Sequence, residues 1–216
     1  MPISDAVTAL DRDLRDIFGD RLRSLVVYAT ADRSKGATEP TLAVVEALTP
    51  ADLRACAARV ASWHDAGLAT PLMLEIPEFA RSLDAFPFEF GAILADYEVV
   101  SGGDPFEGLT VDPADVRRAC EVQARSHLLY LREGYIETRG RSDMLAELIA
   151  RSSAPLSALL KSVGRLNAGR PVDPVLAEVA ALGAGPLSSD AARRLFPEYL
   201  SAIEHLTNEI DRWGQV

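Results

Sequence analysis

The hydrophobic pattern of this chain changes near residue 110, and this change limits the folds that the chain can adopt. Before that point, segments with a helical period alternate with short, β-branched runs. After it, apolar residues recur only at the helical spacing of three and four positions. A sheet can therefore form only from the first half, while the second half must bury its apolar residues between helices. We predict two domains, residues 1–110 and residues 111–216.

Four short runs in the first half predict the strands of a small mixed sheet. Each is rich in Val, Leu, Ile or Tyr, and together they cover 25–29, 41–45, 70–76 and 97–100. Helices are predicted before the first strand, at 7–18, and between the strands, from residue 50 onwards and in an amphipathic stretch over 79–90 that Pro87 breaks. The segment Thr49–Asp52 is typical of a helix start, because a hydroxyl cap precedes a proline and an acidic residue.

Helical segments account for the whole second half. Asp112-Pro113 and Asp173-Pro174 each combine a capping carboxylate with a proline at the first helical position. The expected helices cover 113–138, 142–163, 174–183 and 189–213, and Pro155 leaves open whether the second is one helix or two. The predicted fold class is therefore α+β, with a small mixed-sheet domain followed by an all-helical bundle.

Acidic side chains are concentrated in the first half. Residues 1–110 carry 18 of the 32 Asp and Glu residues but only nine of the 22 Lys and Arg residues. A long nucleic acid would be repelled by this charge, whereas a cation would not. We expect no membrane partner, because no apolar run approaches the ~20 residues that span a bilayer. Without a signal sequence or a CxxC pair, a cytoplasmic location is expected. The oligomeric state is left open.

The strand–turn–strand block Leu25–Thr30 and Thr41–Val45 is the most informative part of the chain. It resembles the opening of the nucleotidyltransferase (polymerase-beta-like) fold, and in particular the aminoglycoside nucleotidyltransferases, in which a helical bundle follows that domain. In this family the first strand ends in Gly-Ser, the second opens with Asp-x-Asp, and a later strand carries a third carboxylate. The resemblance implies Mg²⁺ and a nucleoside triphosphate as cofactors.

Each part of the family pattern has a physical reason. Glycine lets the backbone approach the triphosphate, and the serine hydroxyl contacts a phosphate oxygen. Residues i and i+2 of a strand share a face, so Asp-x-Asp directs two carboxylates at one point. There they hold Mg²⁺, which neutralises the charge of the nucleotide and orients the phosphate for attack. The third carboxylate completes the metal site or acts as general base.

This chain matches the pattern only in part. Ala29 stands at the glycine position and Thr30 at the serine position, while Glu39-Pro40-Thr41 replaces Asp-x-Asp. The third carboxylate matches Glu75, which lies between two apolar residues of a predicted strand. The resemblance thus implies a metal site of Glu39, Thr41 and Glu75, with Glu75 as the catalytic carboxylate, and a phosphate contact at Ala29 and Thr30.

Other interpretations of these residues stay open. Arg33 and Lys35, in the loop after the first strand, would bind phosphate or remain solvated loop charges. Glu39 is a metal ligand or a charge at the edge of the sheet. Strand alternation puts Glu75 on the face opposite Leu74, so it is a metal ligand or a solvent-facing side chain.

The missing carboxylate leads to three functional hypotheses. Loss of one metal-bridging carboxylate costs roughly 10³-fold in rate, which favours a catalytically impaired protein. This protein would bind a nucleotide or small molecule in a cleft between the sheet and the bundle. The first alternative is an active, Mg²⁺-dependent enzyme that transfers a nucleoside monophosphate to a hydroxyl of a small, aminoglycoside-like acceptor. The second alternative is a helical scaffold that binds a protein partner.

Overall fold

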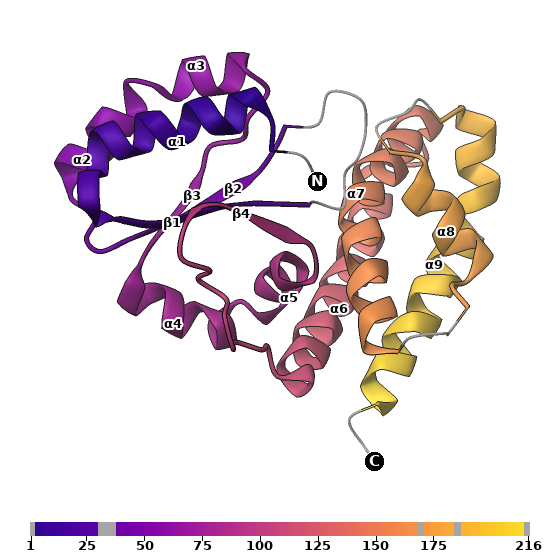
Figure 1. Ribbon diagram of the computed structural model, residues 1–216. Coiled ribbons are helices and arrows are strands. Elements are labelled where there is room, and N and C mark those ends of the chain that lie inside the picture. The colour runs from indigo at the N-terminus through magenta and orange to yellow at the C-terminus, as the bar shows by residue number, and fades with distance from the viewer. Residues whose placement is uncertain (1–2, 30–37, 168–170, 184–186, 214–216) are drawn as a thin grey trace. The chain divides into compact units, whose positions relative to one another are not determined.

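The structure is a computed structural model that describes residues 3–29, 38–167, 171–183 and 187–213. Figure 1 shows its ribbon. The chain divides into two compact units, Met1–Val111 and Asp112–Val216. The sequence pattern placed this boundary at residue 110. The first unit holds the sheet and the second is made of helices, so the predicted α+β class is confirmed.

The first unit is built on a four-stranded sheet with the order β3-β2-β1-β4. Its strands are β1 (Leu22–Tyr28), β2 (Thr41–Val45), β3 (Leu72–Glu75) and β4 (Tyr97–Gly102). The central strand β1 runs antiparallel to both β2 and β4, whereas β2 and β3 are parallel. The sheet is therefore mixed, as the sequence predicts.

One face of the sheet is covered by three helices, α1 (Asp5–Phe18), α2 (Pro50–Ala57) and α3 (Val60–Asp65) (Figure 1). The apolar stripe of α1 packs on the side chains that β1 and β2 present to this face, including Val27 and Ala43. The short 3-10 helix η1 (Gly19–Arg21) follows α1 and leads into β1. The predicted start at Thr49 is confirmed, since this residue caps α2 and forms a reciprocal capping box with Asp52.

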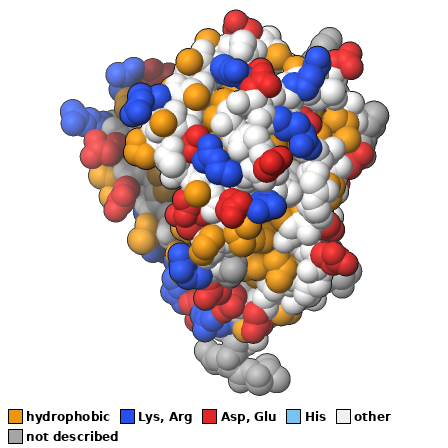
Figure 2. All heavy atoms as spheres, turned by 60° about the vertical axis from the view of Figure 1, so that its left-hand side comes forward, with side chains coloured by type: hydrophobic (Ala, Val, Ile, Leu, Met, Phe, Trp, Pro, Cys, Tyr) orange, Lys and Arg blue, Asp and Glu red, His pale blue; other side chains and the backbone are white. Residues whose placement is uncertain are grey.

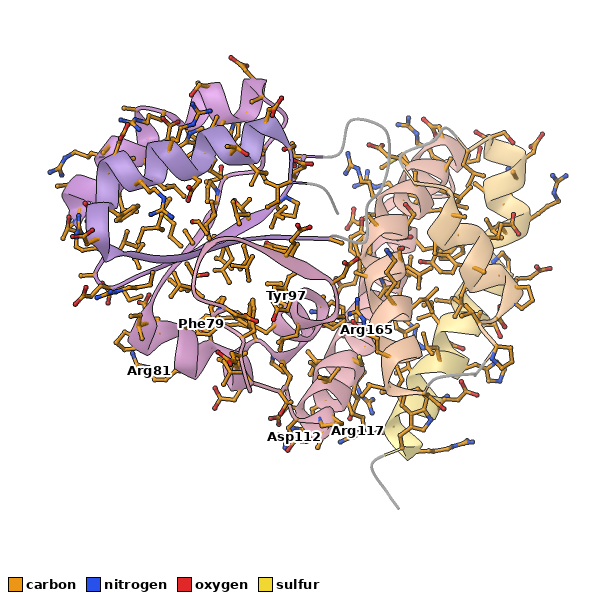
Figure 3. The ribbon with its side chains drawn as sticks, in the orientation of Figure 1. Phe79, Arg81, Tyr97, Asp112, Arg117 and Arg165 are labelled. Atoms are coloured by element: carbon orange, nitrogen blue, oxygen red, sulfur yellow. The ribbon has the colours of Figure 1, made fainter. Side chains whose placement is uncertain are left out.

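The opposite face of the sheet is covered by α4 (Ile76–Ala85) and α5 (Pro87–Ala95). Phe79 lies at the centre of this second core, with its ring centroid 5.9 Å from that of Phe90 and 5.2 Å from that of Phe106. Figure 3 shows Phe79 and Tyr97 on this side of the sheet. The predicted break in this stretch is confirmed, because α4 and α5 meet at Phe86, directly before Pro87.

The second unit consists of α6 (Pro113–Glu137), α7 (Ser142–Leu166), α8 (Pro174–Ala181) and α9 (Ser189–Arg212). The helices α6, α7 and α9 pack against one another, and α8 packs on α7 and α9. Pro155 does not divide α7, which is one continuous helix. Among the residues that the structure describes, no helix combines the length and apolar character needed to cross a bilayer.

A buried polar group lies inside the helical unit. The Nε2 atom of His127 lies 2.5 Å from the hydroxyl of Tyr199, which is also 2.9 Å from the hydroxyl of Ser152. Burial lowers the pKa of His127 to about 4, because the charged imidazolium would lose its hydration. His127 is therefore neutral at pH 7 and part of the core.

Acidic and basic side chains are interspersed on the face drawn in Figure 2. Several of the acidic side chains of the first unit form ion pairs with nearby arginines: Arg15 with Asp11 at 2.9 Å, and Arg23 with Glu46 at 2.7 Å. Pairs of this kind, exposed to solvent, contribute little to stability. Much of the acidity of the first half is thus ordinary surface charge.

Candidate functional site

The candidate site is the end of the sheet at which β1 terminates and β2 and β4 begin. Because β1 is antiparallel to both neighbours, its last residues lie beside the first residues of these strands. The backbone amide of Tyr28 donates to the carbonyl of Pro40 at 3.3 Å, and that of Ala29 donates to the carbonyl of Asp96 at 2.9 Å. The predicted positions Thr30, Arg33 and Lys35 lie outside the described residues.

Glu39 is held at this end of the sheet by both its backbone and its side chain. The backbone of Glu39 forms an isolated parallel bridge with Leu68, and its amide donates to the carbonyl of Gly67 at 2.9 Å. The Oε2 atom accepts a hydrogen bond of 2.5 Å from the hydroxyl of Ser4, the residue that caps α1. The carboxylate thus lies near the N-terminus of α1, where the helix dipole favours negative charge.

Thr41, two residues further along, is fully buried. Its side chain lies on the same face of β2 as Ala43, which packs against α1, α2 and α3. Among the described residues, its Oγ1 atom has no hydrogen-bond partner. The position that corresponds to the second aspartate of the family pattern is therefore a neutral hydroxyl enclosed by protein.

Glu75 lies at the opposite end of the strands, beside the last residue of β2, so the predicted grouping of Glu39, Thr41 and Glu75 is wrong. In the parallel pairing of β2 and β3, Glu75 stands beside Val45, four residues beyond Thr41. At ~3.3 Å per residue, this places the backbones of Thr41 and Glu75 about 13 Å apart. Oxygen ligands lie about 2–2.5 Å from a magnesium or calcium ion, so these residues do not share one.

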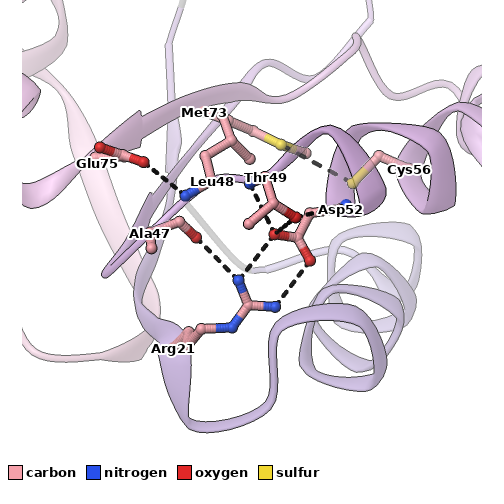
Figure 4. Close-up of polar contacts among 8 residues, drawn as sticks. All are labelled: Arg21, Ala47, Leu48, Thr49, Asp52, Cys56, Met73 and Glu75. Atoms are coloured by element: carbon pink, nitrogen blue, oxygen red, sulfur yellow. Dashed lines mark hydrogen bonds and ion pairs between the residues drawn. The ribbon is translucent and has the colours of Figure 1, made fainter.

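The interactions of Glu75 explain why it interrupts an apolar strand. Figure 4 shows its Oε1 atom accepting a hydrogen bond of 2.7 Å from the backbone amide of Leu48, in the turn between β2 and α2. Glu75 is also the capping residue of α4, and its own amide donates to Oε2 of Glu78 at 3.1 Å. Its carboxylate therefore joins β3 to the β2–α2 turn.

A second carboxylate supports the same turn. Both oxygens of Asp52 accept hydrogen bonds of 2.8 Å from the guanidinium of Arg21, and Oδ2 also accepts from the amide and hydroxyl of Thr49 (Figure 4). The hydrogen bond from Arg21 is the main reason why the pKa of Asp52 lies well below its usual range. The contacts of Asp52 and Glu75 at this end of the sheet therefore hold the β2–α2 turn in place.

Glu98 is a carboxylate of the candidate site that sequence reasoning missed. It pairs with Val27 on β1, and Val27 pairs with Thr41 on β2. Paired residues of antiparallel strands point to the same face, so Thr41, Val27 and Glu98 form one row across three strands. The Oε2 atom of Glu98 is buried. A glutamate inside the apolar run 97–100 was the available signal.

The donors that the described residues supply at this end of the sheet do not fit a two-metal centre. Glu39 and Glu98 supply carboxylates on this face, while Thr41 supplies a buried hydroxyl. Within the described part of the chain, no group of three or more His, Cys, Asp or Glu side chains is arranged to hold a metal ion. Two Mg²⁺ ions beside a triphosphate would need several anionic protein ligands.

The tyrosine that opens β4 belongs to the other face of the sheet. The hydroxyl of Tyr97 donates to Oδ2 of Asp104 at 2.9 Å, and its ring packs on Phe106 with centroids 4.7 Å apart. Burial, and to a smaller extent this hydrogen bond, raise the pKa of Tyr97. The phenol is therefore protonated at neutral pH and fixes the segment that follows β4.

Comparisons with known proteins support the fold. No family model matches the chain, and no curated protein matches it. Among solved structures, the chain is similar to spectinomycin adenyltransferase AAD(9) from Enterococcus faecialis, crystallised with ATP and spectinomycin. The TM-score is 0.51 at 13% identity, over 96% of this chain and 98% of that one. A likeness at this identity shows the fold alone, which is nucleotidyltransferase-like.

Proposed function

We propose that this chain is a catalytically impaired protein of nucleotidyltransferase fold that binds a nucleotide or another small molecule where β1 ends. The observation that carries the proposal is Thr41. It is fully buried and neutral at the position where the second metal-binding carboxylate is expected. A polar group that no ligand needs can be enclosed in this way, whereas a metal-binding carboxylate has to reach its ion.

The retained architecture is the reason to propose binding. The similar solved structure covers nearly the whole of this chain, and that protein was crystallised with ATP and spectinomycin. Loops at a sheet edge commonly carry ligand-binding residues on a rigid scaffold. The amide of Ala29 is already bonded to Asp96, so a phosphate would need other donors. We propose Thr30, Arg33 and Lys35 for this role, together with an optional Mg²⁺ carried by the nucleotide.

The impairment follows from the donor set. Removal of one electrostatic stabiliser from an active site costs about 10²–10³-fold in rate. Here the second aspartate is replaced by Thr41, and the carboxylate predicted as general base, Glu75, lies at the other end of the sheet. The loss of both from this end of the sheet, among the residues that the structure describes, supports a protein that transfers nucleoside monophosphates slowly or not at all.

Calorimetric titration with ATP, GTP, CTP and UTP tests binding, with Mg²⁺ and with a chelator. We expect one nucleotide to bind with similar affinity in both conditions, and the double variant Arg33→Ala/Lys35→Ala to bind it more weakly. The matched control is Arg23→Ala, which removes an exposed arginine on β1 outside this edge. Unchanged binding in the double variant would reject the phosphate role of Arg33 and Lys35.

A transfer assay with labelled nucleotide and spectinomycin tests the impairment. We expect no transfer above the rate without protein, in the original chain and in Glu39→Gln. Mg²⁺-dependent transfer that is lost in Glu39→Gln but kept in Glu75→Gln would instead establish the active enzyme. The third hypothesis, a helical scaffold, stays a prediction, and co-purification with a defined protein in the absence of nucleotide binding would favour it.

A further inference from the structure

Three large apolar side chains form an exposed stripe along α6. Val122 is 63% exposed, Leu129 55% and Ile136 73%. They recur every seven residues, so each lies only about 20° around the helix and about 10.5 Å further along it than the one before. Single exposed apolar residues are common, but a nearly straight stripe about 21 Å long is typical of a helix that packs against a partner. We call these three residues the α6 stripe.

The α6 stripe lies opposite the face of this helix that packs inside the second unit. Residues two positions apart are about 200° apart around a helix. Each member of the stripe is followed two positions later by a buried residue, in turn Ala124, Leu131 and Thr138. The second unit therefore uses one face of α6 for its own core, with α7 and α9, and presents a second apolar face to solvent.

The two flanks of the stripe carry different side chains at the same seven-residue spacing. All of these side chains are exposed, and they are Arg118, Arg125 and Arg132 on one flank and Gln123, Tyr130 and Glu137 on the other. Two of the arginines form ion pairs with α9, Arg125 with Asp211 at 3.0 Å and Arg132 with Glu204 at 2.7 Å. These pairs hold the guanidinium groups beside the stripe, and each guanidinium has further N–H groups to donate.

The flanks fit a second copy of α6 in one direction. In a parallel pair of helices, each flank lies beside the opposite flank of the other copy, about five residues further along. Arg132 then meets Glu137 of the second copy as an ion pair, and Arg125 meets Tyr130 as a cation–π contact. In an antiparallel pair the two arginine flanks would face each other and repel. The surface is thus complementary to itself, which a two-fold dimer requires.

We propose that α6 packs in parallel against α6 of a second copy of this chain, with Val122, Leu129 and Ile136 at the contact. Removal of these side chains from water drives the association, and the flanks set its direction. Glu133 lies on the same face, between Leu129 and Ile136, so its two copies approach each other and lower the affinity. We expect a dissociation constant of roughly tens of micromolar. The proposal does not depend on nucleotide binding by the first unit.

Sedimentation velocity of the full chain between about 5 and about 500 µM tests the dimer. We expect the average mass to rise with concentration toward that of two chains. Leu129→Glu should stay monomeric, because it buries a carboxylate of each copy in the contact. The matched control is Leu53→Glu, the same change at a leucine of α2 that is 51% exposed, and it should dimerise like the original chain.

Circular dichroism establishes that each variant is folded. An original chain that stays monomeric over the whole range of concentration would overturn the proposal, and would leave a different protein as the occupant of this face. Folded Leu129→Glu protein that dimerises like the original would overturn it as well.

Glu133→Leu tests the same contact by strengthening it. The change removes the repulsion between the two carboxylates and adds apolar surface to the stripe, so we expect the dimer to become about tenfold tighter or more. Its control is Glu107→Leu, the same change at an exposed position of the first unit, which should leave the dissociation constant unchanged. A dimer that Glu133→Leu leaves unchanged or weakens would contradict a contact along this face.

Cysteine cross-linking measures the direction of the pair. The natural cysteines Cys56 and Cys120 are buried, so mild oxidation of Val122→Cys and Ile136→Cys reports on the introduced thiols. We expect each variant to form a disulfide with its own copy faster than the control Leu53→Cys, which gives the rate of random collision. In an equimolar mixture, mass spectrometry should find no disulfide between positions 122 and 136. A mixed disulfide, or cross-linking no faster than the control, would overturn the parallel dimer.

Discussion

The carboxylate of Glu75 and the backbone amide of Leu48 are joined by a hydrogen bond of 2.7 Å. This bond ties the end of β3, where α4 begins, to the turn that leads from β2 into α2. It gives Glu75 a structural role at the end of the sheet that lies away from Glu39 and Thr41.

Substitution of Glu75 is expected to affect stability and not ligand binding. Glu75→Ala leaves the amide of Leu48 without its partner and should lower the free energy of unfolding by about 1–2 kcal/mol. Glu75→Gln keeps an accepting oxygen and should cost less than half as much. Urea unfolding measures both, and nucleotide titration serves as the control. A loss of binding in folded Glu75→Gln protein would contradict this role.

Thr41→Val is expected to stabilise the first unit. The hydroxyl of Thr41 is buried and has no hydrogen-bond partner among the described residues, so it loses its hydration on folding without compensation. Replacing it by a methyl group of similar size should raise the free energy of unfolding by about 1 kcal/mol. Thermal unfolding checks this, and a decrease in stability would indicate that the hydroxyl is satisfied in solution.

Thr41→Asp tests for a latent metal site by the opposite change. A carboxylate at this fully buried position would lose its hydration, so stability should fall by about 3 kcal/mol or more. We expect Mg²⁺ and a chelator to give the same unfolding temperature. Recovery of stability with Mg²⁺, absent in the matched Thr41→Asn variant, would show that a metal ion binds beside β2.

The helical unit should lose stability as the pH falls from about 6.5 to about 4, because of His127. Its pKa is lowered to about 4 by burial, against 6.5 for an exposed histidine, so the unfolded chain binds the extra proton in this interval. The contribution amounts to about 3 kcal/mol, is fully present above pH 6.5, and is lost toward pH 4. Urea unfolding between pH 4 and 6.5 checks this: the free energy of unfolding should change less steeply with pH in His127→Gln than in the original chain.

Two glycines of the helical unit should respond in opposite ways to alanine. A Cβ atom at Gly134 of α6 would lie 2.5 Å from a methyl carbon of Leu148 on α7, whereas one at Gly164 meets nothing within 4 Å. Gly164→Ala should therefore stabilise by up to about 1 kcal/mol, as alanine favours helix. Gly134→Ala should give no gain or a loss of about 1–2 kcal/mol. Urea unfolding of both variants compares them directly.

Local chemistry made most of the elements predictable from the sequence. The strands and the helix caps at Thr49, Asp112 and Asp173 depend on neighbouring residues only. The helix expected after residue 50 is less regular than its apolar spacing suggests, since it divides into α2 and α3. Arg59, between them, donates to the backbone carbonyl and to Oδ1 of Asp13 on α1, a contact that the local sequence does not encode.

The candidate site was harder to predict because it depends on register. Strand alternation gives the face on which Glu75 lies, but not the end of the sheet at which its strand terminates. That end is set by the parallel pairing of Glu75 with Val45, which comes from the packing of helices on both sides. The same limitation hid Glu98, whose proximity to Thr41 depends on both ladders of β1.

The position of β1 at the centre of the sheet also affects how the first unit folds. Its partner β2 is near in sequence, but β4 pairs Tyr97 with Tyr28 across all the residues from 29 to 96. Contacts of such long range form late in folding, and β1 keeps one hydrogen-bonding edge open until then. Until then, the run Leu25-Val26-Val27 on this strand can pair with a strand of another chain during synthesis. The pairing of β4 with β1 closes that open edge.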